Sequence, residues 1–391
     1  MAWGAMAIRD QRVRFVVRAS QGEENFSALC EEFEISRPTG YRWWGRYQQQ
    51  GVLGIEERSR RPRRSPERTA AEIEEQVVQL RQRRPDWGAR KLQVLLQRQG
   101  TRLATRTVHR ILVRQGLLRE QERQGHALER FERAAPNQLW QMDFKSPKGW
   151  GEAVGPLSVL DDHSRYLIAL QQTGCTQSAV VRERLEEAFR ESGMPEEMLM
   201  DHGTPWWNAQ APSGWTKLRV WLMKQGIVCR FGRYRHPQTQ GKVERFHGAL
   251  EMARRRRGLP PDRERQGWLD EFRQEYNHLR PHDALGGQTP AQRWRPSARR
   301  YDPHPPEWQY GAGAEVQRLG RNGQLKLQGR WWQVSEALAH ERVQLVEIQN
   351  RVLVYYCHSL VREIDFTGQC STAVERWSQP STCNGCPGNA V

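Results

Sequence analysis

The apolar side chains follow three successive patterns along the chain. Up to about residue 118 they recur every three or four positions, as in short helices. Between residues 137 and 295, continuous apolar runs alternate with helical stretches, which is the order of an α/β domain with a mixed sheet. Beyond residue 296, short runs alternate apolar with polar positions, as in antiparallel strands. The chain is therefore predicted to be multidomain: all-α first, then α/β, then small and all-β.

Breaks in composition place the boundaries between these parts. Residues 56–68 are rich in arginine and contain prolines, which predicts an extended basic linker able to follow a phosphate backbone. The predicted parts are a helix-turn-helix domain (1–55), the linker (56–68), a second helix-turn-helix domain (69–125), an α/β core (130–295), a β-rich domain (296–367) and a disordered tail (368–391).

The stretch SRPTGYRWW predicts a DNA-reading helix. Phe26, Leu29 and Phe33 form an apolar stripe, and Ser36 is a suitable N-cap for the helix that follows. Two short helices joined by a tight turn, the second rich in arginine and aromatic residues, are typical of a helix-turn-helix unit. A plain helical hairpin fits the same pattern. The residues expected to contact DNA here are Arg37, Thr39, Arg42 and Arg46.

The stretch TRTVHRILVRQG repeats this theme. Arg106, Arg110 and Arg114 fall four positions apart and share one helical face, while the opposite face is apolar. We expect Arg106 and Arg110 to contact DNA. Two such units on one chain favour a long, bipartite DNA site.

The C-terminal part offers two local signals. Asn322-Gly323 predicts a tight hairpin turn within the β-rich domain. Cys383 and Cys386 form a CxxC pair in the tail, but the sequence has no second pair at zinc-ligand spacing, which favours a disordered tail over a zinc site.

Charge narrows the class of partner. The chain has 61 Lys and Arg against 45 Asp and Glu, a net charge of +16, which favours a polyanion and above all nucleic acid. No apolar run is long enough to span a membrane, and the first residues lack a signal-peptide pattern. Seven scattered cysteines fit reduced thiols, so we expect a cytoplasmic protein acting on the nucleoid. P-loop, nucleophile-elbow and HExxH motifs are absent from the sequence.

Three acids remain as candidate catalytic residues. Asp143 interrupts an apolar strand pattern, Asp201 ends a buried strand, and Glu244 begins an amphipathic helix. A sheet can bring the two aspartates side by side, with the helix packed behind them. Converging carboxylates repel one another unless divalent cations lie between them, and hard oxygen ligands suit Mg²⁺. Two such ions, roughly 3.5–4 Å apart, would hold the attacking and leaving oxygens of a phosphoryl transfer, with Asp143 bridging both.

Asp161 and Asp162 are the rival acids, but a turn or salt-bridge role beside Arg165 fits them better. His247 lies one helical turn beyond Glu244 and is expected either to touch the scissile phosphate or to position an acid. Along the same helix, the residues expected to hold DNA are Lys242, Arg245, Arg254 and Arg255. A solvated helix end is the alternative reading of the run from Arg254 to Arg257.

Five segments together carry a family resemblance: LWQMDFK, VLDDHSRYL, LMDHGTPW, HPQTQGKVERFHGAL and YNHLRPHDALGGQTP. They resemble the integrase-like DDE transposases of bacterial insertion sequences, which share the retroviral integrase core. The resemblance implies a ribonuclease H-like core, Mg²⁺ or Mn²⁺ as cofactor, and Asp143, Asp201 and Glu244 as catalytic metal ligands.

The resemblance also implies a mechanism. The helical units would bind terminal inverted repeats, activated water would free a 3′-hydroxyl at the element's end, and that hydroxyl would attack target DNA. Because two ends must be held at once, a homo-oligomer is expected. Two other classes stay open: a non-catalytic DNA-binding regulator, and a nuclease that stops after hydrolysis.

Overall fold

The computed structural model describes residues 8–56, 69–118, 132–151, 153–208, 214–232 and 241–373. Most of the predicted linker, the turn from His236 to Gln240 and the Cys383–Cys386 pair therefore lie outside the described residues. The chain divides into two compact units, Met1–Thr69 and Ala70–Val391. None of the described helices combines the length and apolar character needed to cross a bilayer.

The first unit is a three-helix bundle. Its elements are α1 (Ile8–Gln21), α2 (Phe26–Glu32), α3 (Arg37–Gln50) and the 3₁₀ turn η1 (Gly51–Ile55). Phe15, Leu29 and Cys30 are buried between the helices. Gly40 lets α3 lie tightly on α2, because a Cβ atom there would stand 2.6 Å from the sulfur of Cys30. The predicted apolar stripe and the helix beginning after Ser36 are thus confirmed.

The second unit begins with another three-helix module. Its helices are α4 (Ala71–Arg83), α5 (Ala89–Arg98) and α6 (Thr105–Arg114). Val77, Leu92, Val108 and Ile111 are fully buried in its core, because the apolar stripes of all three helices converge there.

The α/β core contains a five-stranded mixed sheet. Its strands are β1 (Leu139–Phe144), β2 (Leu157–Asp161), β3 (Leu167–Gln171), β4 (Glu197–Met200) and β5 (Val228–Phe231). They lie in the order β3-β2-β1-β4-β5. The first three strands pair antiparallel, and β4 and β5 add in parallel through helical crossovers. The predicted order of elements is therefore confirmed.

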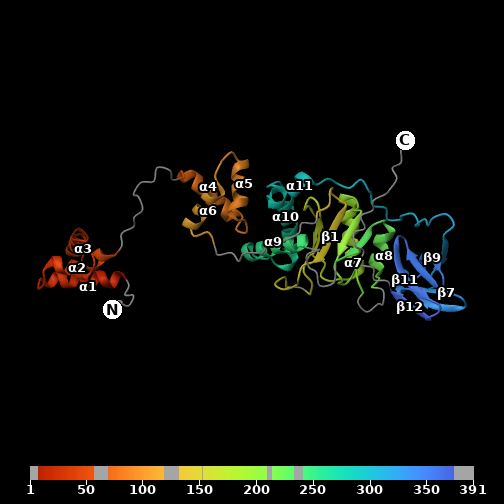
Figure 1. The fold of residues 1–391 in the computed structure, drawn as a ribbon. Helices are drawn as coiled ribbons and strands as arrows, with labels where there is room; N and C mark the ends of the chain where they lie inside the picture. The colour runs from red at the N-terminus through yellow and green to blue at the C-terminus, as the bar shows by residue number, and fades with distance from the viewer. Residues whose placement is uncertain are drawn as a thin grey trace, which may run out of the picture. The chain divides into compact units, whose positions relative to one another are not determined.

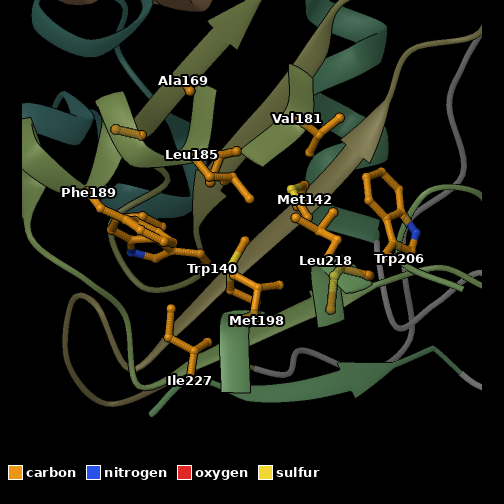
Figure 2. Close-up of a cluster of buried hydrophobic side chains, with 14 of the residues drawn as sticks. Trp140, Met142, Ala169, Val181, Leu185, Phe189, Met198, Trp206, Leu218 and Ile227 are labelled. Atoms are coloured by element: carbon orange, nitrogen blue, oxygen red, sulfur yellow. The ribbon is translucent and has the colours of Figure 1, made fainter. Parts of the chain in front are cut away.

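Helices cover both faces of this sheet (Figure 1). They are α7 (Ser178–Ser192) and α8 (Lys217–Lys224) on one face, and α9 (Gly241–Arg257) and α10 (Asp262–Gln274) on the other. Trp140 and Met142 of β1 point towards α7 and α8, where Leu185, Phe189 and Leu218 pack on them (Figure 2). Side chains alternate along a strand, so Gln141 and Asp143 point towards α9.

Short helical turns close the core after α10. They are the π turn η3 (Glu275–Leu279), η4 (Asp283–Leu285) and α11 (Pro290–Arg293). In η3, the buried side chain of Asn277 bonds both the N–H (2.8 Å) and the C=O (3.0 Å) of Leu167. Asn277 thereby provides hydrogen-bond partners for backbone groups of β3, which is one of the two edge strands of the sheet.

A buried ionic cluster joins the α4–α6 module to the core. The side chain of Asp86 is fully buried and pairs with Arg257 at 2.7 Å and Arg280 at 3.2 Å. Arg257 also pairs with Glu275 at 2.6 Å. On α5, Arg98 donates to the carbonyl oxygen of Gly287 at 2.9 Å. The module is thus fixed to the end of α9 and the loops after it.

The C-terminal domain is all-β, as predicted. Its strands are β6 (Glu315–Arg318), β7 (Gln324–Leu327), β8 (Arg330–Gln333), β9 (Arg342–Ile348), β10 (Arg351–Tyr356), β11 (Ser359–Asp365) and β12 (Cys370–Ala373), with the 3₁₀ turn η5 (Glu336–Leu338). Five of them form a sheet in the order β12-β11-β10-β9-β6, and β7 and β8 form a separate pair.

Two predictions about this domain were wrong. The tail does not begin at Gly368, because β12 pairs with β11 and continues to Ala373. Asn322-Gly323 does not join two paired strands, since it lies between β6 and β7. The actual hairpin turn is Gln328-Gly329, where both residues adopt positive φ, as a two-residue hairpin turn between β7 and β8 requires.

Candidate active site

Strand register brings the two candidate aspartates to the same edge of the sheet. In the parallel pair β1–β4, Trp140 lies opposite Met198 and Gln141 opposite Leu199. The same offset carried two residues further places Asp143 opposite Asp201, and both point to the α9 face. The structure therefore contains the parallel strand pairing that the prediction of side-by-side acids requires.

Helix α9 supplies the third acid from above this face. Val243, Phe246 and Leu250 are buried against the sheet and α10, which fixes the rotation of the helix. Glu244 follows Val243 and is exposed at the start of α9. Its negative charge raises the pKa of Asp143.

The charges of the three acids are coupled. Burial, and then the negative charges of Asp201 and Glu244, raise the pKa of Asp143 to about 7. The backbone N–H of Phe144 and the charge of Lys145 act in the opposite direction and are outweighed. Burial and two neighbouring carboxylates thus favour the protonated form of Asp143, and a bound cation would favour the ionised form.

His247 lies against Asp143 and does not project into solvent. Its Nδ1 is 3.7 Å from Asp143 Oδ2, and its Nε2 is 3.0 Å from the hydroxyl of the fully buried Ser158. Ser158 lies opposite Asp143 in the β1–β2 pair. Burial lowers the pKa of His247 to about 3, so the ring is neutral at physiological pH. Of its two predicted roles, this placement favours positioning the acid.

Trp206 holds Asp201, a contact that the sequence did not predict. The indole N–H of Trp206 donates to Asp201 Oδ1 at 2.6 Å, and the N–H of Gly203 donates to the same oxygen at 2.9 Å. The Trp206 ring stacks on Phe144, the neighbour of Asp143, with centroids 5.4 Å apart. One buried indole thus contacts both Asp201 and the ring next to Asp143.

The rival acids have structural partners. Asp161 is fully buried and accepts hydrogen bonds from Asn137 N and from the N–H and hydroxyl of Ser164. Asp162 is also buried, and it pairs with Lys242 Nζ at 2.5 Å. Their predicted turn and salt-bridge roles are therefore what the structure shows, although the partner of Asp162 is Lys242 and not Arg165.

The predicted DNA contacts fall into two groups. Arg37, Arg42, Arg106, Arg110 and Arg245 are exposed. The others already have partners within the protein or are half-buried: Lys242 with Asp162, Arg254 and Arg255 with Glu251, Thr39 with Ser36, and Arg46 half-buried on α3. Lys242 in particular secures the start of α9 to the loop after β2.

The donor set suits a hard divalent cation. Carboxylate oxygens are the ligands that Mg²⁺ and Mn²⁺ prefer, and the pKa of Asp143 is raised by burial and, less strongly, by the charges of the other two acids. Within the described ranges, no three His, Cys, Asp or Glu side chains stand close enough to form a ready metal-binding group. Like charges repel, so we expect the three acids to draw together only around a cation.

Comparison with protein families agrees with this geometry. A model of the integrase core domain matches residues 133–237, and a second integrase core model matches residues 225–290. The chain carries an integrase core domain. A helix-turn-helix domain model matches residues 11–63, and a homeodomain-like domain model matches residues 39–112.

Similar proteins place this integrase core in context. The insertion element IS407 uncharacterized 31.7 kDa protein of Burkholderia multivorans is 26% identical over 223 residues, covering 55% of this chain and 78% of its own length. The chain thus combines helix-turn-helix and integrase core domains and is similar to a protein of an insertion element.

Solved retroviral structures also match. The HTLV-2 integrase catalytic core domain, solved with magnesium in a trimeric form, is 17% identical and covers 41% of this chain and 97% of its own, with a TM-score of 0.32. A chain of the simian T-cell lymphotropic virus intasome, solved with the PP2A regulatory subunit B56 gamma, is 17% identical, covers 77% of this chain and 100% of its own, and has a TM-score of 0.34.

Proposed function

We propose that this integrase-like protein cuts DNA at the ends of an insertion element and joins those ends to target DNA by a DDE mechanism. The observation that supports it most is the register of β1 and β4, which puts Asp143 opposite Asp201 beneath the helix that carries Glu244. The negative charges of Asp201 and Glu244 that act on Asp143 support the same grouping.

The three acids would hold Mg²⁺ or Mn²⁺, two ions per site, with Asp143 as the shared ligand. Cations held there would supply positive charge to the phosphate as its bond to the leaving oxygen breaks. The chain itself positions the acids: His247 lies against Asp143, and Trp206 and Gly203 fix Asp201 Oδ1. Water and then the freed 3′-hydroxyl are the successive nucleophiles, with no covalent enzyme intermediate.

The DNA would be held by arginines outside the acid site. Arg37 and Arg42 on α3 and Arg106 and Arg110 on α6 are exposed and suit recognition of the terminal inverted repeats. Arg245 is exposed next to Glu244 and suits a phosphate near the cleaved bond. Because joining requires two ends in one complex, a homo-oligomer is part of the proposal.

A strand-transfer assay tests this function. The substrate is a labelled duplex from the DNA that flanks the gene, incubated with Mg²⁺ and target plasmid. The parent protein is expected to cleave and join it, and Glu244→Gln to lose roughly 10²–10³-fold of both activities, since one charged group that acts in the transition state is removed. Glu251→Gln, on the same helix and paired with Arg254, is the matched control and should remain active.

The other outcomes separate the competing functions. Cleavage without joining would identify a nuclease, and binding without cleavage a DNA-binding regulator. Full activity of Glu244→Gln would show that the acid assignment is wrong.

Trp206→Phe is expected to weaken metal use without unfolding the core. Phenylalanine keeps the ring over Phe144 but removes the N–H that holds Asp201, and loss of such a supporting hydrogen bond typically costs about 10–100-fold in metal affinity. Titrating Mg²⁺ in the cleavage assay should show a higher half-saturating concentration. Trp221→Phe is the control, because it removes a buried indole N–H that has no partner among the described residues. An unchanged Mg²⁺ requirement in Trp206→Phe would show that the Trp206 indole does not position Asp201 for metal binding.

A further inference from the structure

Arg219 is held between two aromatic rings in the first turn of α8. Its guanidinium carbon lies 3.8 Å from the centroid of Trp215 and 4.9 Å from that of Phe231. Stacking of this kind fixes the plane of a guanidinium and suits it to planar, bidentate recognition of an oxyanion. A cation in the first turn of a helix also opposes the helix dipole, so local helix stability does not explain it.

Among the described residues, no carboxylate pairs with this guanidinium. Burial lowers the pKa of Arg219 to about 10, which still leaves it charged at neutral pH, and no carboxylate acts on it. Its Nε is buried without a hydrogen-bond partner among the described residues. The neighbouring segments 209–213 and 233–240, outside the described ranges, contain no Asp or Glu in their sequence. A partly buried charge is costly unless an anion accompanies it.

Two other basic residues, His358 and Arg230, belong to the surroundings of Arg219. His358, in the turn between β10 and β11, has its pKa lowered by burial and then by the charges of Arg219 and Arg230. Arg230 is already paired with Glu197 at 2.6 Å. Of the two arginines, Arg219 is the one whose guanidinium has no acidic partner among the described residues.

The position of Arg219 relates it to the acid site. Phe231, on which it stacks, lies opposite Met200 in the β4–β5 pair, and Met200 directly precedes Asp201. The ring of Phe231 is also 5.7 Å from that of His202, the residue after Asp201. Arg219 therefore lies at the end of the sheet where β4 and β5 end, but on the face covered by α7 and α8, whereas the acids point to the α9 face.

We propose that Arg219 binds a phosphate of the DNA backbone, at a site separate from the three acids, on the other face of the sheet near its β4–β5 end. This inference rests on the proposed function, because it takes DNA as the ligand. A backbone phosphate would supply the missing counter-charge and accept two parallel N–H bonds from the stacked guanidinium. The cost of keeping the charge partly buried in the free protein would then be recovered when DNA binds.

Arg219→Met in the full-length chain tests this site. Binding of a short random-sequence duplex is measured in chelator over a range of salt concentrations. The variant is expected to bind more weakly, with the slope of log affinity against log salt reduced by about one unit, which is the loss of one phosphate contact. Its Tm should be unchanged or higher, since an apolar side chain of similar length replaces an unpaired, partly buried charge.

Two further variants make the result specific. Arg182→Met is the matched control, because Arg182 also lies over a tryptophan, Trp221, but pairs with Glu186 at 2.8 Å, so the slope should not change. Arg219→Lys keeps the charge and should keep the slope. A Tm that falls in Arg219→Met with an unchanged slope would overturn the proposal and leave Arg219 a structural residue.

The same experiment separates this proposal from the proposed function. An unchanged slope in Arg219→Met, with normal cleavage by the parent, removes only the phosphate site. A parent protein that binds no duplex at any salt concentration removes both.

Discussion

Replacing Asp143 with asparagine is expected to abolish DNA cleavage and, at the same time, to make the metal-free protein more stable. The loss of activity should reach roughly 10³-fold, because the carboxylate proposed to bridge both cations is gone. The gain in stability follows from the same crowding of charge. Burial and the charges of Asp201 and Glu244 make ionisation of Asp143 costly in the folded state, and asparagine cannot ionise.

The pH dependence of this stability has a definite sign. The folded protein holds the Asp143 proton up to about pH 7, whereas the unfolded chain releases it near the ordinary value of 3.8. The wild-type, metal-free protein therefore loses stability as pH rises from about 4 to 7, by an amount on the order of 2–4 kcal/mol. Asp143→Asn should not lose it, so the stabilities of the two proteins diverge between about pH 4 and 7 and differ by a constant amount above pH 7.

Thermal unfolding in chelator between pH 5 and about pH 8, compared with cleavage in Mg²⁺, measures both effects. Asp283→Asn is the matched control, since Asp283 is exposed and pairs only at the surface with Arg90. It should change neither property. If Asp143→Asn lowers the Tm at pH 8 in chelator, the acids do not repel one another as described.

The second large effect is expected at a buried ion pair outside the acid site. Asp162 is fully buried, and Lys242, 13% exposed, pairs with it at 2.5 Å. Gln141 donates to the same carboxylate at 2.8 Å. Asp162→Ala removes the partner of a largely buried ammonium and should destabilise the protein by about 3–5 kcal/mol. Urea unfolding followed by circular dichroism measures the change.

A double variant separates the loss of the pair from the loss of a side chain. Asp162→Leu combined with Lys242→Met replaces both charges by apolar groups and should recover most of the lost stability, since isolated buried charges cost more than paired or absent ones. If the double variant is no more stable than Asp162→Ala, the buried charge of Lys242 is not the source of the effect.

Sequence patterns sufficed for the order of elements because each strand of the core is a short apolar run and each helix has a clear stripe. They also separated Asp143 from Asp161 and Asp162, since Asp161 and Asp162 lie where a strand ends in a turn. The parallel pairing of β1 with β4 could not be inferred from neighbouring residues, because β2, β3 and α7 lie between the two strands in the sequence. The register, known from Leu139 to Gln141, supports placing the two acids side by side, and their metal-binding role stays a prediction.

Contacts between distant segments were the part that the sequence left hidden. Trp206 looked like one more aromatic residue, and nothing local indicates that its indole N–H reaches Asp201. Nothing local indicated that Lys242 pairs with Asp162 or Arg254 with Glu251, and their contact with DNA stays a prediction. The hairpin prediction at Asn322-Gly323 failed because a glycine-containing turn also occurs between strands that do not pair.

The buried ionic cluster around Asp86 has a consequence for where cleavage would occur. It fixes the α4–α6 module to the end of α9, the same helix that begins with Glu244. If α6 binds a terminal repeat, the distance between the module and the acids is fixed. The cut would then fall a set number of base pairs from the bound sequence. Substitutions that weaken the cluster would then make the cleavage position less uniform before they lowered the cleavage rate.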